Sequence, residues 1–197
     1  MSVRRTEITR ADILPPDRYA LERAARRKAL IAVKRNRRVA VGPCAVVHFE
    51  NYETMWQQVH EMLHIEKGGE EQIAGELRAY NSLIPKGAEL VATVMFEIAD
   101  PVRRAAELGR LGGVEKMVTL RFAGHTIVAR PEDDLERTNE AGKTSAVHFL
   151  HFGFTPEQIA AFRVPGTEVI LGIGHPHYGH MAVVPEAVRA ELAGDFA

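Results

Sequence analysis

The order of the hydrophobic patterns along the chain limits the folds that it can adopt. Apolar residues recur at helical spacing through most of the first eighty residues, and runs rich in β-branched and aromatic residues dominate beyond residue 88. Helices first and strands later are typical of an α+β fold. We therefore expect one α+β domain over residues 1–197, with N-terminal helices packed on a mixed, largely antiparallel sheet. The helical part covers about residues 1–80 and the strand-rich part about residues 88–184.

Local signals place the individual elements. Pro15-Pro16-Asp17 predicts a helix start, and Lys67-Gly68-Gly69 predicts a helix end. Gly42-Pro43 breaks the first β segment, and the polar segment 131–143 predicts a surface loop with a helical turn. The expected helices lie at about 16–35, 51–66, 70–80, 101–110, 156–163 and 185–193. The expected strands lie at about 39–50, 89–98, 116–122, 125–130, 145–152 and 168–173.

Composition excludes several classes of protein. The chain has 46% apolar and 26% charged residues, which is ordinary for a soluble globular protein and unlike a disordered or fibrous one. No apolar run is long enough to span a bilayer, and the charged N-terminus lacks the apolar core of a signal peptide. The only cysteine, Cys44, excludes an internal disulfide and fits a reducing cytoplasm, where we expect it to act as a small buried hydrophobe.

The charges are distributed unevenly along the chain. Residues 1–38 hold 12 Lys/Arg against 4 Asp/Glu, a balance of +8, so a net charge of −1 leaves −9 for residues 39–197. The densest basic segment, residues 26–38, contains no aromatic side chain that could stack on a base. We therefore expect a solvated or self-neutralising helix face in this segment rather than a nucleic-acid site.

The sequence HEMLH matches the zinc-hydrolase signature H-E-x-x-H, in which two histidines bind zinc and the glutamate acts as general base. At about 100° per residue, His60 and His64 lie together on the flank of the apolar helix stripe, and Glu61 points nearly away from the core. The metzincin extension requires glycine and histidine where this chain has Lys67 and Glu70. A zinc-dependent hydrolase is therefore an alternative without an identified third ligand.

Five further histidines fall in two short downstream segments. SAVHFLHF supplies His148 and His151, which an extended strand directs to opposite faces. GIGHPHYGH supplies His175, His177 and His180 in a turn rich in glycine and proline, where several side chains can surround one ion. Imidazole is a suitable ligand for zinc, iron, copper or nickel. His148 is the stronger candidate of the strand pair, because a histidine buried among apolar residues needs a partner.

Six segments spread over the chain form a recognisable set. They read RRVAVGP (37–43), FENYETMWQQVHEML (49–63), ELRAYNSLIP (76–85), LVATVMFEI (90–98), KTSAVHFLHF (143–152) and GHPHYGH (174–180). Together they resemble an uncharacterised bacterial family of unknown function, and the resemblance spans nearly the whole chain. Genes of that family tend to neighbour genes for rubrerythrin-like diiron proteins and iron–sulfur oxidoreductases.

The resemblance also distinguishes between individual residues. The family has glutamine at the position of His60 and commonly arginine or another residue at that of His64, so this chain departs from the pattern there. Glu61 and Glu50 match the pattern, whereas the downstream histidines 151 and 177 do not. The downstream residues that match are His148, His175, Tyr178 and His180. The resemblance implies Glu61 and Tyr178 as the catalytic candidates.

These observations lead to one leading hypothesis and a second alternative. The leading hypothesis is a cytoplasmic protein of oxidative-stress or redox metabolism that binds iron or zinc through His148, His175, His180 and Glu50. Its partner would be a rubrerythrin-like or iron–sulfur redox protein, as the resemblance implies. The second alternative is a non-catalytic interaction module whose basic N-terminal helix docks on an acidic partner. The charge asymmetry is also compatible with a homodimer.

Overall fold

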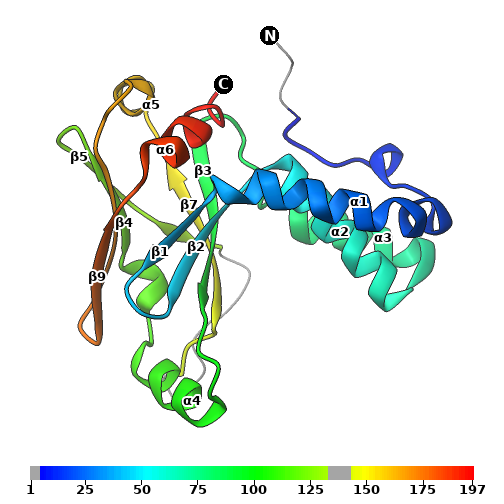
Figure 1. The fold of residues 1–197 in the computed structure, drawn as a ribbon, viewed down its shortest axis with the longest axis horizontal. Helices are drawn as coiled ribbons and strands as arrows, with labels where there is room; N and C mark the ends of the chain where they lie inside the picture. The colour runs from blue at the N-terminus through cyan, green and yellow to red at the C-terminus, as the bar shows by residue number, and fades with distance from the viewer. Residues whose placement is uncertain (1–4, 133–142) are drawn as a thin grey trace.

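The computed structural model of the protein describes residues 5–132 and 143–197. It shows two sheets that face each other and an arm of helices that extends to one side of them (Figure 1). The fold is α+β, as the sequence predicts. In the described residues the helices are α1 Pro16–Arg35, α2 Tyr52–Glu66, α3 Gly69–Asn81, α4 Pro101–Arg110, α5 Pro156–Arg163 and α6 Glu186–Ala193, with short 3-10 turns η1 Arg10–Asp12 and η2 Val114–Lys116.

In the described part of the chain, every pairing of neighbouring strands is antiparallel. One sheet has the strand order β1-β2-β3-β7-β6, and the other has the order β5-β4-β8-β9. The strands are β1 Arg38–Val41, β2 Ala45–Glu50, β3 Glu89–Phe96, β4 Val118–Phe122, β5 His125–Val128, β6 Arg130–Pro131, β7 Val147–Gly153, β8 Val169–His175 and β9 Tyr178–Val183. The strands thus divide into two antiparallel sheets, where the sequence suggested a single mixed one.

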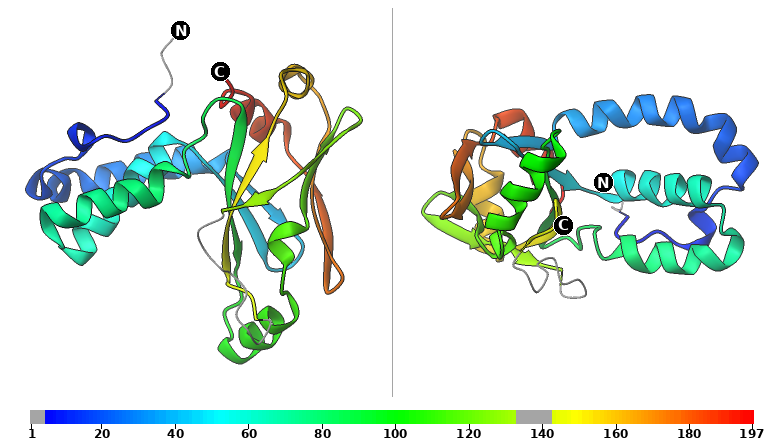
Figure 2. Two further views of the ribbon diagram at one scale, coloured as in Figure 1. Left: turned by 180° about the vertical axis from the view of Figure 1, so that it is seen from behind. Right: turned by 90° about the horizontal axis from the view of Figure 1, so that it is seen from below.

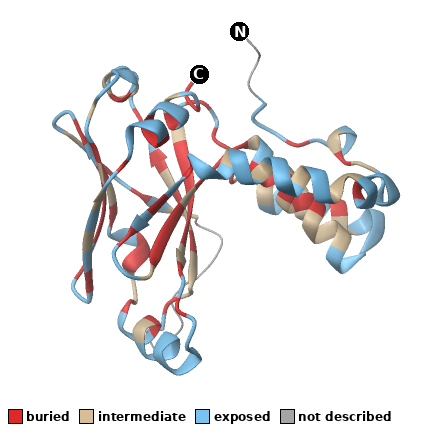
Figure 3. Ribbon diagram, in the orientation of Figure 1, coloured by how far each residue is buried: buried red, intermediate tan, exposed pale blue. Residues whose placement is uncertain are grey.

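The main hydrophobic core lies between the two sheets (Figure 3). Alternating residues of each strand face this core, as Leu150 and Phe152 of β7 and Leu171 of β8 show. Phe162 of α5 and Leu192 of α6 close one end of the core. None of the described residues that form this core belongs to the helical arm.

The arm consists of α1, α2 and α3, which lie side by side and point away from the sheets (Figure 2). It has a smaller core of its own, in which Ile13, Val59 and Ile73 are buried. Val91 of β3 belongs to the same cluster, so the arm core continues onto the outer face of the five-stranded sheet.

Arg37, directly after α1, joins the arm to the sandwich. Its side chain is 1% exposed and pairs with Asp195, beyond α6. Its Nε donates to the carbonyl of Phe49 at 3.0 Å, and its Nη2 donates to that of Glu50 at 3.1 Å. The start of β1 is thereby fixed between β2 and the C-terminal segment.

The first and last residues predicted for α4 and α5 agree with the structure. Asp100 and Thr155 each cap a helix with the side chain and are followed by proline. The glycine and proline residues of segment 174–180 predict a turn, and the structure has one at Pro176 and His177. The turn is shorter than predicted, because β8 ends at His175 and β9 begins at Tyr178 and pairs with β8. The surface loop predicted over 131–143 lies mostly outside the described residues.

Among the described residues, none of the helices combines the length and the apolar character needed to cross a membrane.

Candidate interaction site on the helical arm

α1 is a long helix that buries very little of itself. It starts at a proline pair, runs for 20 residues rich in alanine and arginine, and buries only Tyr19. One side packs along α2 through Arg23, Arg26 and Leu30, which are half-buried. Its other side faces solvent, so the helix has a fixed inner face and a free outer face.

A polar network fixes the inner face of α1 to α2. Arg23 donates two hydrogen bonds to Glu61, at 2.9 and 2.7 Å, and the Tyr19 hydroxyl donates a third at 2.6 Å. Gln57 bridges Tyr19 and Glu61. The bonds from Arg23, and next those from Tyr19, lower the pKa of Glu61 to about 2, although burial opposes the shift. Burial, and then the bond to Glu61, raises the pKa of Tyr19.

This network changes the interpretation of Glu61. The sequence placed its side chain on the outside of the helix, but α1 covers that side. A carboxylate with a pKa of about 2 is a poor acceptor of protons at neutral pH, so it is unsuited to act as a general base. The geometry supports a positioning role for Glu61 in holding α1.

His60 is buried and engaged at both ring nitrogens. Its Nδ1–H donates to the carbonyl of Trp56 at 2.8 Å, and its Nε2 accepts from the amide of Leu14 at 3.0 Å. Burial lowers the pKa of His60 and favours this neutral form. With both nitrogens engaged, His60 and His64 do not offer a metal the pair of free imidazoles that HEMLH suggests, and the geometry does not favour the zinc-hydrolase alternative.

The outer face of α1 combines positive charge with apolar surface. Leu21 and Ile31 are 87% and 65% exposed, about three helical turns apart. Four exposed cations share their face, and no ion pair joins them to another residue in the described ranges. These cations are Arg27, Lys28, Lys34 and Arg35. At 100° per residue the acidic Glu22 falls outside this face, whereas the exposed Asp17 lies on it, one turn before Leu21 at the N-terminal end of the helix.

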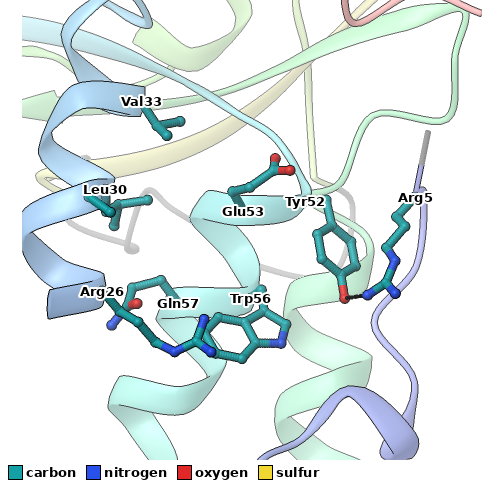
Figure 4. A pocket seen from close by; sticks show the side chains of 9 residues that line it. Arg5, Arg26, Leu30, Val33, Tyr52, Glu53, Trp56 and Gln57 are labelled. Atoms are coloured by element: carbon teal, nitrogen blue, oxygen red, sulfur yellow. Dashed lines mark hydrogen bonds between the residues drawn. The ribbon is translucent and has the colours of Figure 1, made fainter. Parts of the chain in front are cut away.

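A groove of about 390 Å³ separates part of α1 from α2. Figure 4 shows Leu30 and Val33 of α1 opposite Tyr52 and Trp56 of α2. The guanidinium of Arg26 lies 4.5 Å from the centre of a Trp56 ring. The groove therefore adds an aromatic wall beside the basic helix.

The predicted metal ligands lie in the sandwich rather than in the arm. His148 is buried on β7, where its Nε2–H donates to the carbonyl of Ser145 at 2.9 Å. His175 is buried at the end of β8, and its Nδ1 accepts from the amide of His177. The His180 ring lies 4.5 Å from that of Tyr178 on β9.

Tyr178 holds the turn between β1 and β2. Its hydroxyl donates to the carbonyl of Val41 at 2.7 Å and accepts from the amides of Cys44 and Ala45 at 3.0 and 2.9 Å. Burial is the main cause that raises the pKa of Tyr178 to about 12. A hydroxyl with three backbone partners supports a structural role rather than a catalytic one.

The structure brings Tyr178 and His180 together but separates Glu50 from them. Tyr178 binds the Ala45 end of β2, whereas Glu50 ends the same strand, about 17 Å away at 3.4 Å per residue. Glu50 accepts a hydrogen bond from Thr93 at 2.7 Å. The residues in the described ranges include no group of three histidine, cysteine or acidic side chains arranged to hold a metal ion. The iron or zinc site thus stays a prediction.

A charged cluster that was not predicted from the sequence lies on the outer face of the five-stranded sheet. The Nδ1 of His151 lies 3.0 Å from Glu89, and its Nε2 lies 2.6 Å from Glu132. The bond to Glu89, and next the bond to Glu132, raises the pKa of His151. The alternation along β7 does predict that His151 opposes His148, but its partners are distant in sequence.

The fold and the site define a small α+β protein in which a β-sandwich carries a helical arm whose first helix, α1, is basic. The chain belongs to the family described as "Protein of unknown function (DUF3501)", whose model matches residues 7–196. It is similar to a crystal structure from Burkholderia pseudomallei K96243 titled a novel protein of unknown function. The two share 39% sequence identity and a TM-score of 0.89 over 96% of this chain and 99% of the other. A comparison with curated proteins gives no match.

Proposed function

We propose that the protein is a non-catalytic interaction module that binds an acidic partner protein along the outer face of α1. The observation that carries this proposal is the grouping of Leu21 and Ile31 with four cations on one exposed face. Binding surfaces combine apolar contact with complementary charge, and this face supplies both. The Glu61 network supports the proposal because it holds α1 in one position for recognition.

Other occupants fit this face less well. Single-stranded nucleic acids stack on aromatic side chains, and the outer face of α1 has none. An interfacial membrane helix needs a broad apolar face, whereas this one offers only Leu21, Ile31 and intervening alanines. Antiparallel or parallel pairing with a second copy would bring like charges together at Lys28 and Arg35.

The resemblance to a family with redox-related gene neighbours indicates which acidic partner to test first. A rubrerythrin-like or iron–sulfur protein of the same cytoplasm would perform the redox chemistry, and this chain would bind it. In that arrangement the buried histidines of the sandwich are structural.

The test is a binding measurement with purified partners. The wild-type protein is titrated by calorimetry into a rubrerythrin-like protein and an iron–sulfur oxidoreductase of the same organism. Lys28→Glu combined with Arg35→Glu should weaken binding by at least about tenfold, or about 1.4 kcal/mol. Wild-type affinity should also fall as salt rises, because exposed charges are screened.

The control reverses the same number of charges elsewhere. Arg103→Glu combined with Lys116→Glu alters exposed cations at the α4 end of the sandwich and should leave the affinity unchanged. The proposal is contradicted if both double substitutions weaken binding equally, or if the wild-type protein binds neither partner. Tighter binding of RNA or of anionic vesicles to the wild type would assign α1 to those ligands instead.

A further inference from the structure

A second cavity lies at the far end of the arm, away from the groove in Figure 4. Its volume is about 600 Å³, and it lies between the start of α1, the end of α2 and the start of α3. The segment that precedes α1 passes along it, fixed by the bond from the Leu14 amide to His60. A cavity of this size accommodates a small organic molecule.

The cavity has an apolar wall and a polar end. The wall is made of aliphatic side chains, prolines and the rings of Tyr19 and His60. The polar end carries Arg10, Asp17, His64, Lys67 and Glu70. An apolar body with one polar head matches this division.

The side-chain donors at the polar end can bind an anionic head. Arg10 already binds Glu70 through hydrogen bonds of 2.5 and 2.7 Å, so these two charges offset each other. The side chains of His64 and Lys67 have no hydrogen bond or ion pair to another residue of the described ranges, and both can donate. Asp17 is the one carboxylate left, which disfavours a head with two negative charges.

The backbone adds to this preference. Two helices, α1 and α3, begin at the cavity, and the N-cap residue of each makes no side-chain capping bond. Pro16 has no amide hydrogen, so α1 offers the amides of Asp17 and Arg18, and α3 offers those of its own first turn. The positive ends of both helix dipoles also favour an anion. These amides supplement the two side chains and the cavity on which the assignment rests.

We infer that this cavity binds a small amphiphilic carboxylate. Its apolar body lies against Leu63 and Ile73, and its carboxylate accepts from Lys67 and His64. HEMLH then lines a binding site without forming a metal site: His60 is part of the wall, His64 faces the head group, and Glu61 turns to α1. The inference is independent of the partner proposed for the outer face of α1.

The test uses the chain's only tryptophan. Trp56 stacks on His60 at 3.7 Å between ring centres, so its fluorescence should report a ligand beside His60. Octanoate, decanoate and 2-naphthoate are each titrated into the protein below their critical micelle concentrations. Decanol and decylamine serve as the neutral and cationic controls. At least one carboxylate should saturate the signal and bind at least tenfold more tightly than both controls.

Three variants locate the site. Lys67→Gln with His64→Gln should weaken carboxylate binding at least tenfold and leave decanol binding unchanged. Ala20→Trp, at an exposed position on the cavity wall, should abolish binding, as measured by calorimetry because it adds a second fluorophore. Lys28→Gln, on the outer face of α1, should have no effect. The inference is overturned if none of the three carboxylates binds, if decanol binds equally well, or if Lys67→Gln with His64→Gln leaves carboxylate affinity intact.

Discussion

At the scale of single residues, Glu61 is most informative because its partners decide its role. Arg23 and Tyr19 bind its carboxylate from the neighbouring helix, so its charge contributes to the packing of α1 on α2. Its position in a zinc-hydrolase pattern had suggested proton transfer. The contacts of the side chain, rather than its place in the motif, identify what it does.

Glu61→Gln tests this structural role. The substitution should lower the free energy of unfolding by about 1–3 kcal/mol at pH 7, because Arg23 loses a charged partner. The folded-state pKa lies below the ordinary value of 4.5, so this contribution is present above pH 4.5 and is lost as the pH falls toward 2. Urea unfolding from pH 7 down to pH 2.5 measures the difference. Glu71→Gln, on exposed α3, is the control, and a difference that does not shrink in acid contradicts the assignment.

The contribution of His151 to the free energy of unfolding should have the opposite pH dependence. Its raised pKa means that the imidazolium stabilises the fold below the unfolded value of 6.5, and that this stabilisation is lost as the pH rises through the folded value. His151→Gln should therefore destabilise the protein at pH 6 by about 1–3 kcal/mol and by less at pH 9. Urea unfolding at both pH values, with His125→Gln as control, measures this. An NMR titration that gives His151 a pKa of 6.5 or lower would refute it.

At the scale of secondary-structure elements, the junction after α1 depends on one buried arginine. Arg37 pairs with Asp195 and binds two carbonyl groups of β2. Arg37→Met should cost about 3–5 kcal/mol, since it removes a buried cation that pairs with Asp195 and binds two carbonyl groups. Chemical denaturation measures the loss, and Arg38→Met, at the exposed neighbouring position, should change it little. Similar stabilities for the two variants would show that Arg37 contributes no such anchor.

The elements also show what the sequence can predict. Local signals suffice for α4 and α5, because a capping side chain and a proline mark each start. β9 was missed because its inward positions hold Tyr178 and His180 and two of its outward neighbours are Gly179 and Met181, a weak alternation. The cavity at the far end of the arm and the His151 cluster could not be predicted, because both depend on contacts between segments that are distant in the sequence.

At the scale of the whole molecule, the protein has two hydrophobic cores of unequal size. The sandwich core draws on both sheets and on the helices at its ends, while the arm core is a small cluster that reaches the sandwich through Val91. Elements with little buried apolar surface open at a lower free-energy cost. The arm should therefore open without unfolding of the sandwich.

Hydrogen exchange under native conditions tests this separation. Amides in the middle of α1 should exchange at least about tenfold faster than those of β3 and β7, because α1 buries only Tyr19. Glu61→Gln should accelerate exchange in α1 further and leave β3 unchanged, whereas binding of an acidic partner should slow exchange in α1. Mass spectrometry of peptic fragments resolves these segments. Uniform protection of α1 and β3 would mean that the arm and the sandwich unfold as one unit.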